Sequence, residues 1–207
     1  MRRPSPRRSA MVAFLLLAVA SANAKASTDP LQPKAVPSAA NSTVDANLAL
    51  CPVGHLSFNV VVRDAASNPI QNSTVVVDFC SAPTVDICST PSCTFTGYTN
   101  ATGVVVLNIA GGGTSAAALA SIRADGVPLA QRAVASTDQN GDLVVTPADL
   151  AAIDALLGTT DKRGDLDGDG VVTAADVNIL QAHMGHACGG PVHSRDHSWG
   201  VLKIRYH

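Results

Sequence analysis

Residues 138–149 read DQNGDLVVTPAD and residues 165–176 read DLDGDGVVTAAD. The two stretches repeat at a spacing of 27 residues, and each places oxygen-bearing side chains at positions 1, 3, 5, 9 and 12. Calcium takes about 6 to 8 oxygen ligands, and a loop of this length wraps it with alternate side chains and the carbonyl of position 7. The sequence therefore predicts two calcium sites.

The expected ligands follow from these positions. In the first loop they are Asp138, Asn140, Asp142, the carbonyl oxygen of Val144, Thr146 and Asp149. In the second loop they are Asp165, Asp167, Asp169, the carbonyl oxygen of Val171, Thr173 and Asp176. The chain must turn sharply at position 6, which is Gly170 in the second loop and Leu143 in the first. A positive φ is strained for leucine and not for glycine, so we expect the second site to bind more tightly.

Each loop is followed, and not preceded, by a helical pattern. An EF-hand needs an entering helix, but the residues before both loops carry no apolar period. After the loops, apolar side chains recur at helical spacing: Leu150, Ile153, Leu156 and Leu157, and then Val177, Leu180 and Met184. Gly158 and Gly185 are the expected helix ends. Val145 and Val172, at position 8 of each loop, are expected to pair the two loops back to back.

On these features residues 138–188 resemble a type I dockerin, whose duplicated unit is a loop followed by a helix with Asp at position 12. The resemblance implies a cohesin-like partner on a scaffold or a cell surface. It places the partner contacts at loop positions 10 and 11 and on the exiting helices, which here are Pro147, Ala148, Ala151, Ala174, Ala175 and Asn178. Recognised members carry a hydroxyl pair and a basic pair at such positions, and this chain carries neither. A divergent cohesin, a different partner and the neighbouring domain of the same chain stay open as alternatives.

The N-terminus has the pattern of a bacterial-type secretory signal peptide, residues 1–24. Four arginines precede an apolar run, AMVAFLLLAVA, and an Ala-Asn-Ala cleavage pattern ends it. The run is too short to span a bilayer, so we expect an exported protein without a membrane span. Residues 25–50, rich in Pro, Ser and Ala, are expected to be a linker or an early edge strand. The remaining expected parts are a β-domain at 51–135, the calcium module at 136–188 and a tail at 189–207.

Charge and cysteine content agree with export. All 16 acidic residues are Asp, and without the four leader arginines they face 10 basic residues, a formal net charge of −6. No basic patch with interleaved aromatic residues occurs, which argues against nucleic-acid binding. In an exported protein the five cysteines are expected to form disulfides. The pairing among Cys51, Cys80, Cys88 and Cys93 is open, and Cys188 is expected to be a free thiol, an intermolecular link or a partner of Cys51.

Residues 51–135 have the pattern of a β-domain. Short β-branched or apolar runs alternate with turn signals, among them Asn100 to Gly103, Gly111 to Gly113 and Asp125-Gly126. The expected strands are 58–62, 74–79, 98–99, 104–109 and 117–123. The order of these segments resembles bacterial immunoglobulin-like modules. The predicted fold class is therefore an Ig-like β-sandwich followed by a small α module of two calcium loop-helix repeats.

No catalytic arrangement is evident. The few aspartates of the β region form no recognisable glycosidase pair, and His55 is the only histidine outside the C-terminal region. In that region His183, His186 and Cys188 lie close together, but their spacing fits no closed zinc motif.

These patterns predict a secreted, non-catalytic protein in which a calcium module serves extracellular assembly or attachment. Two alternatives remain: a polysaccharide-binding accessory component of a degradative complex, and a surface adhesin or structural protein whose calcium only stabilises the fold.

Overall fold

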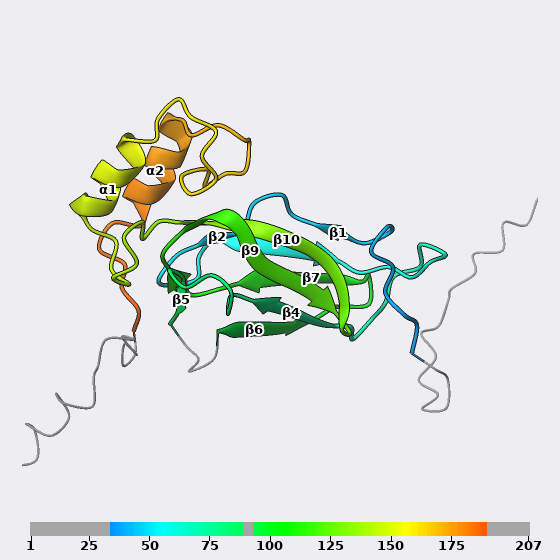
Figure 1. The fold of residues 1–207 in the computed structure, drawn as a ribbon. Helices are drawn as coiled ribbons and strands as arrows, with labels where there is room; N and C mark the ends of the chain where they lie inside the picture. The colour runs from blue at the N-terminus through cyan, green and yellow to red at the C-terminus, as the bar shows by residue number, and fades with distance from the viewer. Residues whose placement is uncertain (1–33, 89–92, 190–207) are drawn as a thin grey trace, which may run out of the picture. The chain divides into compact units, whose positions relative to one another are not determined.

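The computed structural model describes residues 34–88 and 93–189, which form one compact unit (Figure 1). The predicted signal peptide and residues 190–207 of the predicted tail lie outside the described residues. Neither helix in the described part of the chain has the length and hydropathy that a bilayer crossing needs.

Strands come first in the chain and helices last. The strands are β1 (Thr43–Val44), β2 (Ala49–Leu50), β3 (Ser57–Val61), β4 (Thr74–Asp78), β5 (Asp86–Ile87), β6 (Thr94–Tyr98), β7 (Val104–Asn108), β8 (Gly111–Gly112), β9 (Ser115–Ala124) and β10 (Val127–Ser136). The helices are α1 (Pro147–Asp154) and α2 (Ala174–Ala182). β1 and β2 fall within residues 25–50, where the sequence left a linker and an edge strand open.

A three-stranded antiparallel sheet has the order β1-β3-β7. In β3 every second side chain is buried, as the alternation of a half-buried strand requires, and Phe58 lies opposite Leu107 of β7. A five-stranded sheet has the order β2-β10-β9-β4-β6, and β5 and β8 form a separate pair. One core lies within this β part and includes the fully buried Phe79 and Ile122.

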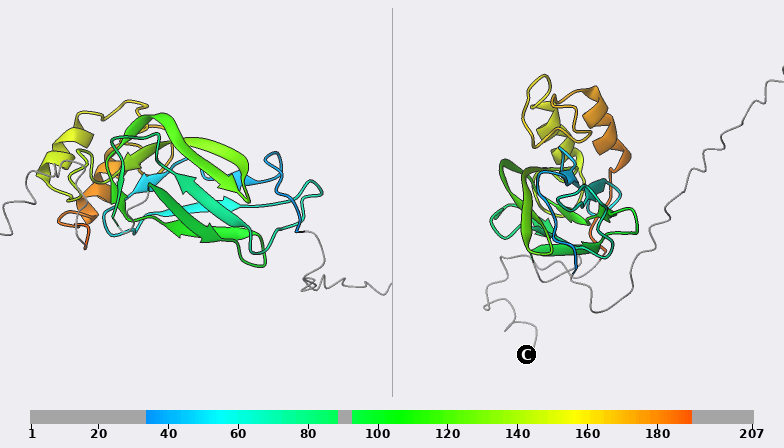
Figure 2. Two further views of the ribbon diagram at one scale, coloured as in Figure 1. Left: turned by 60° about the horizontal axis from the view of Figure 1, so that its bottom comes forward. Right: turned by 90° about the vertical axis from the view of Figure 1, so that its right-hand side faces the viewer.

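The hairpin of β9 and β10 shapes the larger sheet. Asp125 and Gly126 connect the strands with φ angles of 47° and 83°, the left-handed pair that a tight two-residue hairpin needs. The register then shifts between Pro128 and Ala130 and again between Arg132 and Val134. Such bulges bend a strand and increase its twist. Figure 2 shows the hairpin, in light green, curving over the other strands.

The predicted fold class, an Ig-like sandwich plus a small α module of two calcium loop-helix repeats, is wrong. The described part of the chain is mainly β, with 36% of its residues in strands and 11% in helices, and its large sheet curls into a half-barrel. The predicted strand ranges overlap five of the ten strands, β3, β4, β6, β7 and β9. The bulges of β10 and the parallel pairing of its end with β2 determine how the sheet closes. The loop-helix segments have a small buried cluster separate from the core of the sheets, and Ala135 of β10 and Ala49 of β2 also pack into it.

The two loop-helix segments are interleaved. Val145 in the first loop donates its amide to the carbonyl of His186, beyond α2, and accepts from the amide of Gly185, both over 2.8 Å. Val172 in the second loop makes the equivalent 2.8 Å bonds with Thr159 and Gly158, beyond α1. The side chains of Val145 and Val172, at position 8 of the loops, lie in one buried cluster. Their backbones, however, pair with the segment that follows the helix of the other loop and not with each other.

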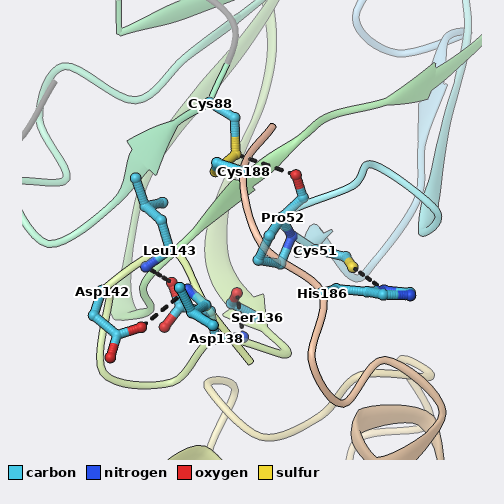
Figure 3. The surroundings of a disulfide bond; sticks show 10 residues. Cys51, Pro52, Cys88, Ser136, Asp138, Asp142, Leu143, His186 and Cys188 are labelled. Atoms are coloured by element: carbon cyan, nitrogen blue, oxygen red, sulfur yellow. Dashed lines mark hydrogen bonds between the residues drawn. A yellow bond between two sulfur atoms is a disulfide. The ribbon is translucent and has the colours of Figure 1, made fainter. Parts of the chain in front are cut away.

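All five cysteines lie in the described residues. Cys80 bonds to Cys93 and Cys88 bonds to Cys188, while Cys51 is free and buried. None of the three expectations for Cys188 holds, because its partner is Cys88. The longer bridge joins the segment after α2 to the end of β5 (Figure 3). Two disulfides are compatible with an extracellular protein.

Candidate metal centre

The first and last aspartates of both loops are buried, at no more than 1% exposure. In the first loop Asp138 Oδ1 accepts from the amide of Gly141 over 2.8 Å. Asp149 Oδ1 accepts from the amides of Gln139 and Asn140, at 2.8 and 3.1 Å, and its Oδ2 accepts from Thr146 N over 2.8 Å. Positions 1 and 12 thus close the loop through its backbone amides.

The second loop repeats this network. Asp165 Oδ1 accepts from the amide of Gly168 over 2.9 Å. Asp176 Oδ1 accepts from the amides of Leu166 and Asp167, at 2.6 and 3.1 Å, and its Oδ2 accepts from Thr173 N over 2.8 Å. Each of these donors stands 27 positions after its counterpart. The repeat seen in the sequence is therefore also a repeat of hydrogen bonds.

Positions 9 to 12 have a second role, since they begin the helices. Thr146 and Thr173 are the N-cap residues of α1 and α2, and each forms a capping box with the aspartate three residues later. The loops and helices are consequently one structural unit. A change of charge at Asp149 or Asp176 acts on the helix start as well as on the loop.

Position 6 has a left-handed backbone in both loops. The φ angle is 68° at Leu143 and 99° at Gly170. The expectation of a positive φ at Leu143 is confirmed. Its side chain is buried, at 5% exposure, and this burial offsets part of the strain. The predicted difference in affinity between the two sites stays a prediction.

The loops differ in the partner of the second carboxylate oxygen, Oδ2, of the aspartate at position 1. Asp138 Oδ2 accepts from the amide of Leu143 over 2.8 Å, whereas Asp165 Oδ2 forms a 2.8 Å ion pair with Lys162. Burial raises the pKa of Asp138 from 3.8 to about 6; the amide hydrogen bonds from Leu143 and Gly141 oppose this, and the charges of Asp149 and Asp142 add to it. A cation at the first loop would relieve both the burial cost and the repulsion.

Three predicted ligands of the second loop already converge. Asp165, Asp167 and Asp176 each offer a carboxylate oxygen, and the three oxygens lie within 4.8 Å of one another. Asp169 is outside this group, and its Oδ1 accepts from the amide of Val171 over 2.9 Å. In the first loop Asn140 Nδ2 donates to Asp142 Oδ2 over 3.0 Å, so these two side chains also meet.

The β part supports both loops. A Cβ atom on Gly112 of β8 would collide with the carboxylate of Asp138, so this position has to be glycine for Asp138 to lie where it does (Figure 3 shows Asp138 beside Leu143). Asn47 Nδ2 donates to the carbonyl of Leu166 over 2.9 Å in the second loop. The geometry of the loops therefore depends on the sheet.

The residues predicted to contact a partner lie on the surface. All six are exposed: Pro147, Ala148, Ala151, Ala174, Ala175 and Asn178. They lie within the first five residues of the two helices. The structure thus leaves this surface free for contacts, without identifying what binds there.

Sequence reasoning missed a second group of possible metal ligands. Cys51, His183 and His186 form such a group, and the ring of His55 lies 5.4 Å from that of His186 between centroids. Burial lowers the pKa of His186, and the neighbouring His183 and His55 lower it further. The distance in sequence between Cys51 and His186 hid this cluster, and Cys188, which the sequence placed beside the histidines, is in a disulfide.

Comparisons with protein-family models, with curated proteins and with solved structures gave no match for this chain.

Proposed function

We propose that this protein is an exported, non-catalytic calcium-binding protein in which two ions, one in each loop, fix the loop-helix segments against the curled sheet. The ligands are the twelve groups that the repeat supplies, from Asp138 to Asp149 and from Asp165 to Asp176. The observation that carries the proposal is the equivalent burial of four carboxylates, at positions 1 and 12 of both loops, within matching hydrogen-bond networks.

Electrostatics supports a cation in both places. Nine of the 16 aspartates lie between residues 138 and 176, where the only basic side chains are Lys162 and Arg163. Arg163 is engaged with Asp161, outside the loops, at 2.7 Å. Buried carboxylates that face one another are costly unless a positive charge neutralises them. Calcium, with its preference for oxygen ligands, suits this donor set.

The proposed role is extracellular assembly or attachment. The small, exposed residues of the helix starts offer a surface with few bulky side chains, and a cohesin-like domain or another surface protein is the proposed partner. In this role calcium acts indirectly, because the loops hold the N-caps of both helices and so set the position of the surface.

A second candidate is a structural protein in which calcium only stabilises the fold. It is favoured by the contacts between loops and sheet, such as the bond from Asn47 to Leu166. A polysaccharide-binding role has less support, since Phe58 and Phe79 are buried, Phe95 is half-buried, and Tyr98 is the one exposed aromatic ring of the four in residues 51–135.

Thermal unfolding of the full chain with calcium and with excess chelator tests the proposal. An ion held only by the folded state and present at a hundred times its Kd stabilises by about 2.7 kcal/mol, or about 5–10 °C for a chain of this size. Asp138→Ala and Asp165→Ala should each reduce the calcium-dependent shift. Asp154→Ala, an exposed aspartate of α1 outside the loops, is the matched control and should retain it. An identical melting temperature with calcium and with chelator would rule the proposal out.

A further inference from the structure

Three side chains outside the two acidic loops, Cys51, His183 and His186, bring their ligand atoms within 4.8 Å of one another, and the ring of His55 lies beside them. Cys51 and His55 lie on either side of a tight turn after β2, and His183 and His186 lie at the end of α2 and in the turn that follows. The ring centroids are separated by 6.1 Å for His55 and His183, 5.4 Å for His55 and His186, and 5.1 Å for His183 and His186. Cys51 Sγ lies 3.7 Å from His186 Nδ1 (Figure 3).

The backbone fixes the positions of these residues. The carbonyl of Cys51 accepts from the amides of Gly54, at 2.8 Å, and Gly111, at 3.1 Å, and Gly54 has the positive φ, 69°, that the turn to His55 needs. The carbonyl of His186 accepts from the amide of Val145 over 2.8 Å. The cluster is thus held by hydrogen bonds on both sides.

A hydrogen bond from one ring nitrogen orients the imidazole of His183. His183 Nδ1 lies 2.8 Å from the carbonyl oxygen of Ile179, to which it can donate a hydrogen bond. In that tautomer the lone pair of Nε2 is free to bind a metal ion. A hydrogen bond from the second ring nitrogen to a carbonyl is the usual arrangement of histidines that bind metals. Cys51 is fully buried and is the one cysteine of the five without a disulfide, so its sulfur is available as a thiolate ligand.

We propose that Cys51, His55, His183 and His186 form a binding site for a zinc ion. Zinc is bound tetrahedrally by thiolate at about 2.3 Å and by imidazole at about 2.0–2.1 Å, which places a sulfur and a nitrogen ligand about 3.6 Å apart. The 3.7 Å between Cys51 Sγ and His186 Nδ1 agrees with this separation. Sulfur and nitrogen donors suit zinc, whereas the oxygen donors of the loops suit calcium, so the two kinds of site select different ions.

The site would add a second crosslink between sheet and helices. His186 stands two residues before Cys188, whose disulfide to Cys88 ties the same segment to the β part. Zinc would join that segment to the turn between β2 and β3 as well. The ordinary alternative is a weak hydrogen bond between the thiol of Cys51 and His186, which needs no metal.

The test uses the full chain, oxidised and held in excess calcium, with Co²⁺ as a spectroscopic probe and Zn²⁺ as competitor. Cys51 supplies the one free thiol, so a thiolate-to-cobalt charge-transfer band assigns Cys51 as a ligand without any substitution. We expect one Co²⁺ per chain, with this band and the visible absorption of tetrahedral cobalt, both removed by one equivalent of Zn²⁺. Absence of the band would overturn the proposal.

Variants then assign the remaining ligands by their zinc affinity. Loss of an outer-shell partner alone costs about 10–100-fold in metal affinity, so loss of a ligand in His186→Ala or His183→Ala should weaken zinc binding by about a hundredfold or more. His55 is more exposed, and His55→Ala should cost about tenfold in zinc affinity, the lower end of that range. His193→Ala, in the C-terminal tail, is the matched control and should leave it unchanged. Calcium binding, measured on each variant, shows that the fold is intact and separates this proposal from that of the loops. Zinc affinity that is lost in His193→Ala and retained in His186→Ala would contradict the site.

Discussion

Val145, in the acidic loop of residues 138–149, donates its amide hydrogen to the carbonyl oxygen of His186, beyond α2, over 2.8 Å. Val172 and Thr159 make the equivalent bond in the second half of the repeat. Each loop is therefore closed by the segment that follows the helix of the other loop. Loss of order in one loop should consequently weaken the other, and the two sites should stabilise the fold together.

The stability of the calcium-free protein should depend on the charge of Asp138. Its pKa is about 6 in the folded chain against 3.8 without the fold, so ionisation near pH 7 costs the folded state on the order of 3 kcal/mol. This cost is absent below pH 3.8 and is complete above about pH 6. In chelator, the stability of Asp138→Asn relative to wild type should therefore rise between pH 4 and pH 7, as measured by denaturant unfolding.

Asp154→Asn, at an exposed position, should show no such trend relative to wild type. A stability difference between Asp138→Asn and wild type that stays constant over this pH range would contradict the role assigned to Asp138.

Lys162 should compete with calcium for the second loop. Its ammonium group lies 2.8 Å from Asp165 Oδ2, at the first ligand position. Lys162→Met removes this competitor, and we expect calorimetry to show a several-fold gain in calcium affinity at one site. Arg163→Met is the matched control, because Arg163 pairs with Asp161 outside the loop and its loss removes the same charge. An equal gain in both variants would mean that only the general charge matters.

The two disulfides should contribute unequally to stability. Cys88 and Cys188 are separated by 100 residues and Cys80 and Cys93 by 13. In the chain-entropy estimate, closing such loops is worth about 4.7 and about 3 kcal/mol. Denaturant unfolding of the paired Cys→Ala variants should therefore show the larger loss for Cys88 and Cys188. A larger loss for the shorter bridge would contradict this order.

The exposed helix starts should form the contact with an extracellular partner. Ala148→Arg combined with Ala174→Arg places bulk and charge on this surface and should abolish partner capture, while the calcium ligands remain unchanged. Capture that survives the double substitution, in a variant shown to bind calcium normally, would favour the structural role of calcium. The control is Ala116→Arg, an exposed alanine of β9, which should capture the partner as wild type does.

Local chemistry made part of this structure predictable. The runs at 74–79 and 104–109 became β4 and β7, each of which ends one residue earlier than predicted, and Asp125-Gly126 became a hairpin turn. Those features depend on residues that are adjacent in the sequence, so a local pattern predicts them. The helices after both loops were likewise visible from their spacing, although they end before Gly158 and Gly185.

The parts that depend on distant contacts were not predictable. β10 was missed because VPLAQRAVAS contains a proline and has no clear alternation, and its strand forms by pairing with β9 and β2. The curl of the sheet follows from bulges that no local pattern marks. Cys51 and His186 are 135 residues apart, so only the folded chain places them together.

Calcium content at saturation is the most direct test of the central claim. The oxidised full chain is dialysed to equilibrium against calcium, and bound metal is measured by atomic emission. We predict two ions per chain, falling to one in Asp138→Ala or Asp165→Ala and staying at two in Asp154→Ala. Less than one ion per chain in the wild type, or a content that the two loop substitutions leave unchanged, would contradict the account.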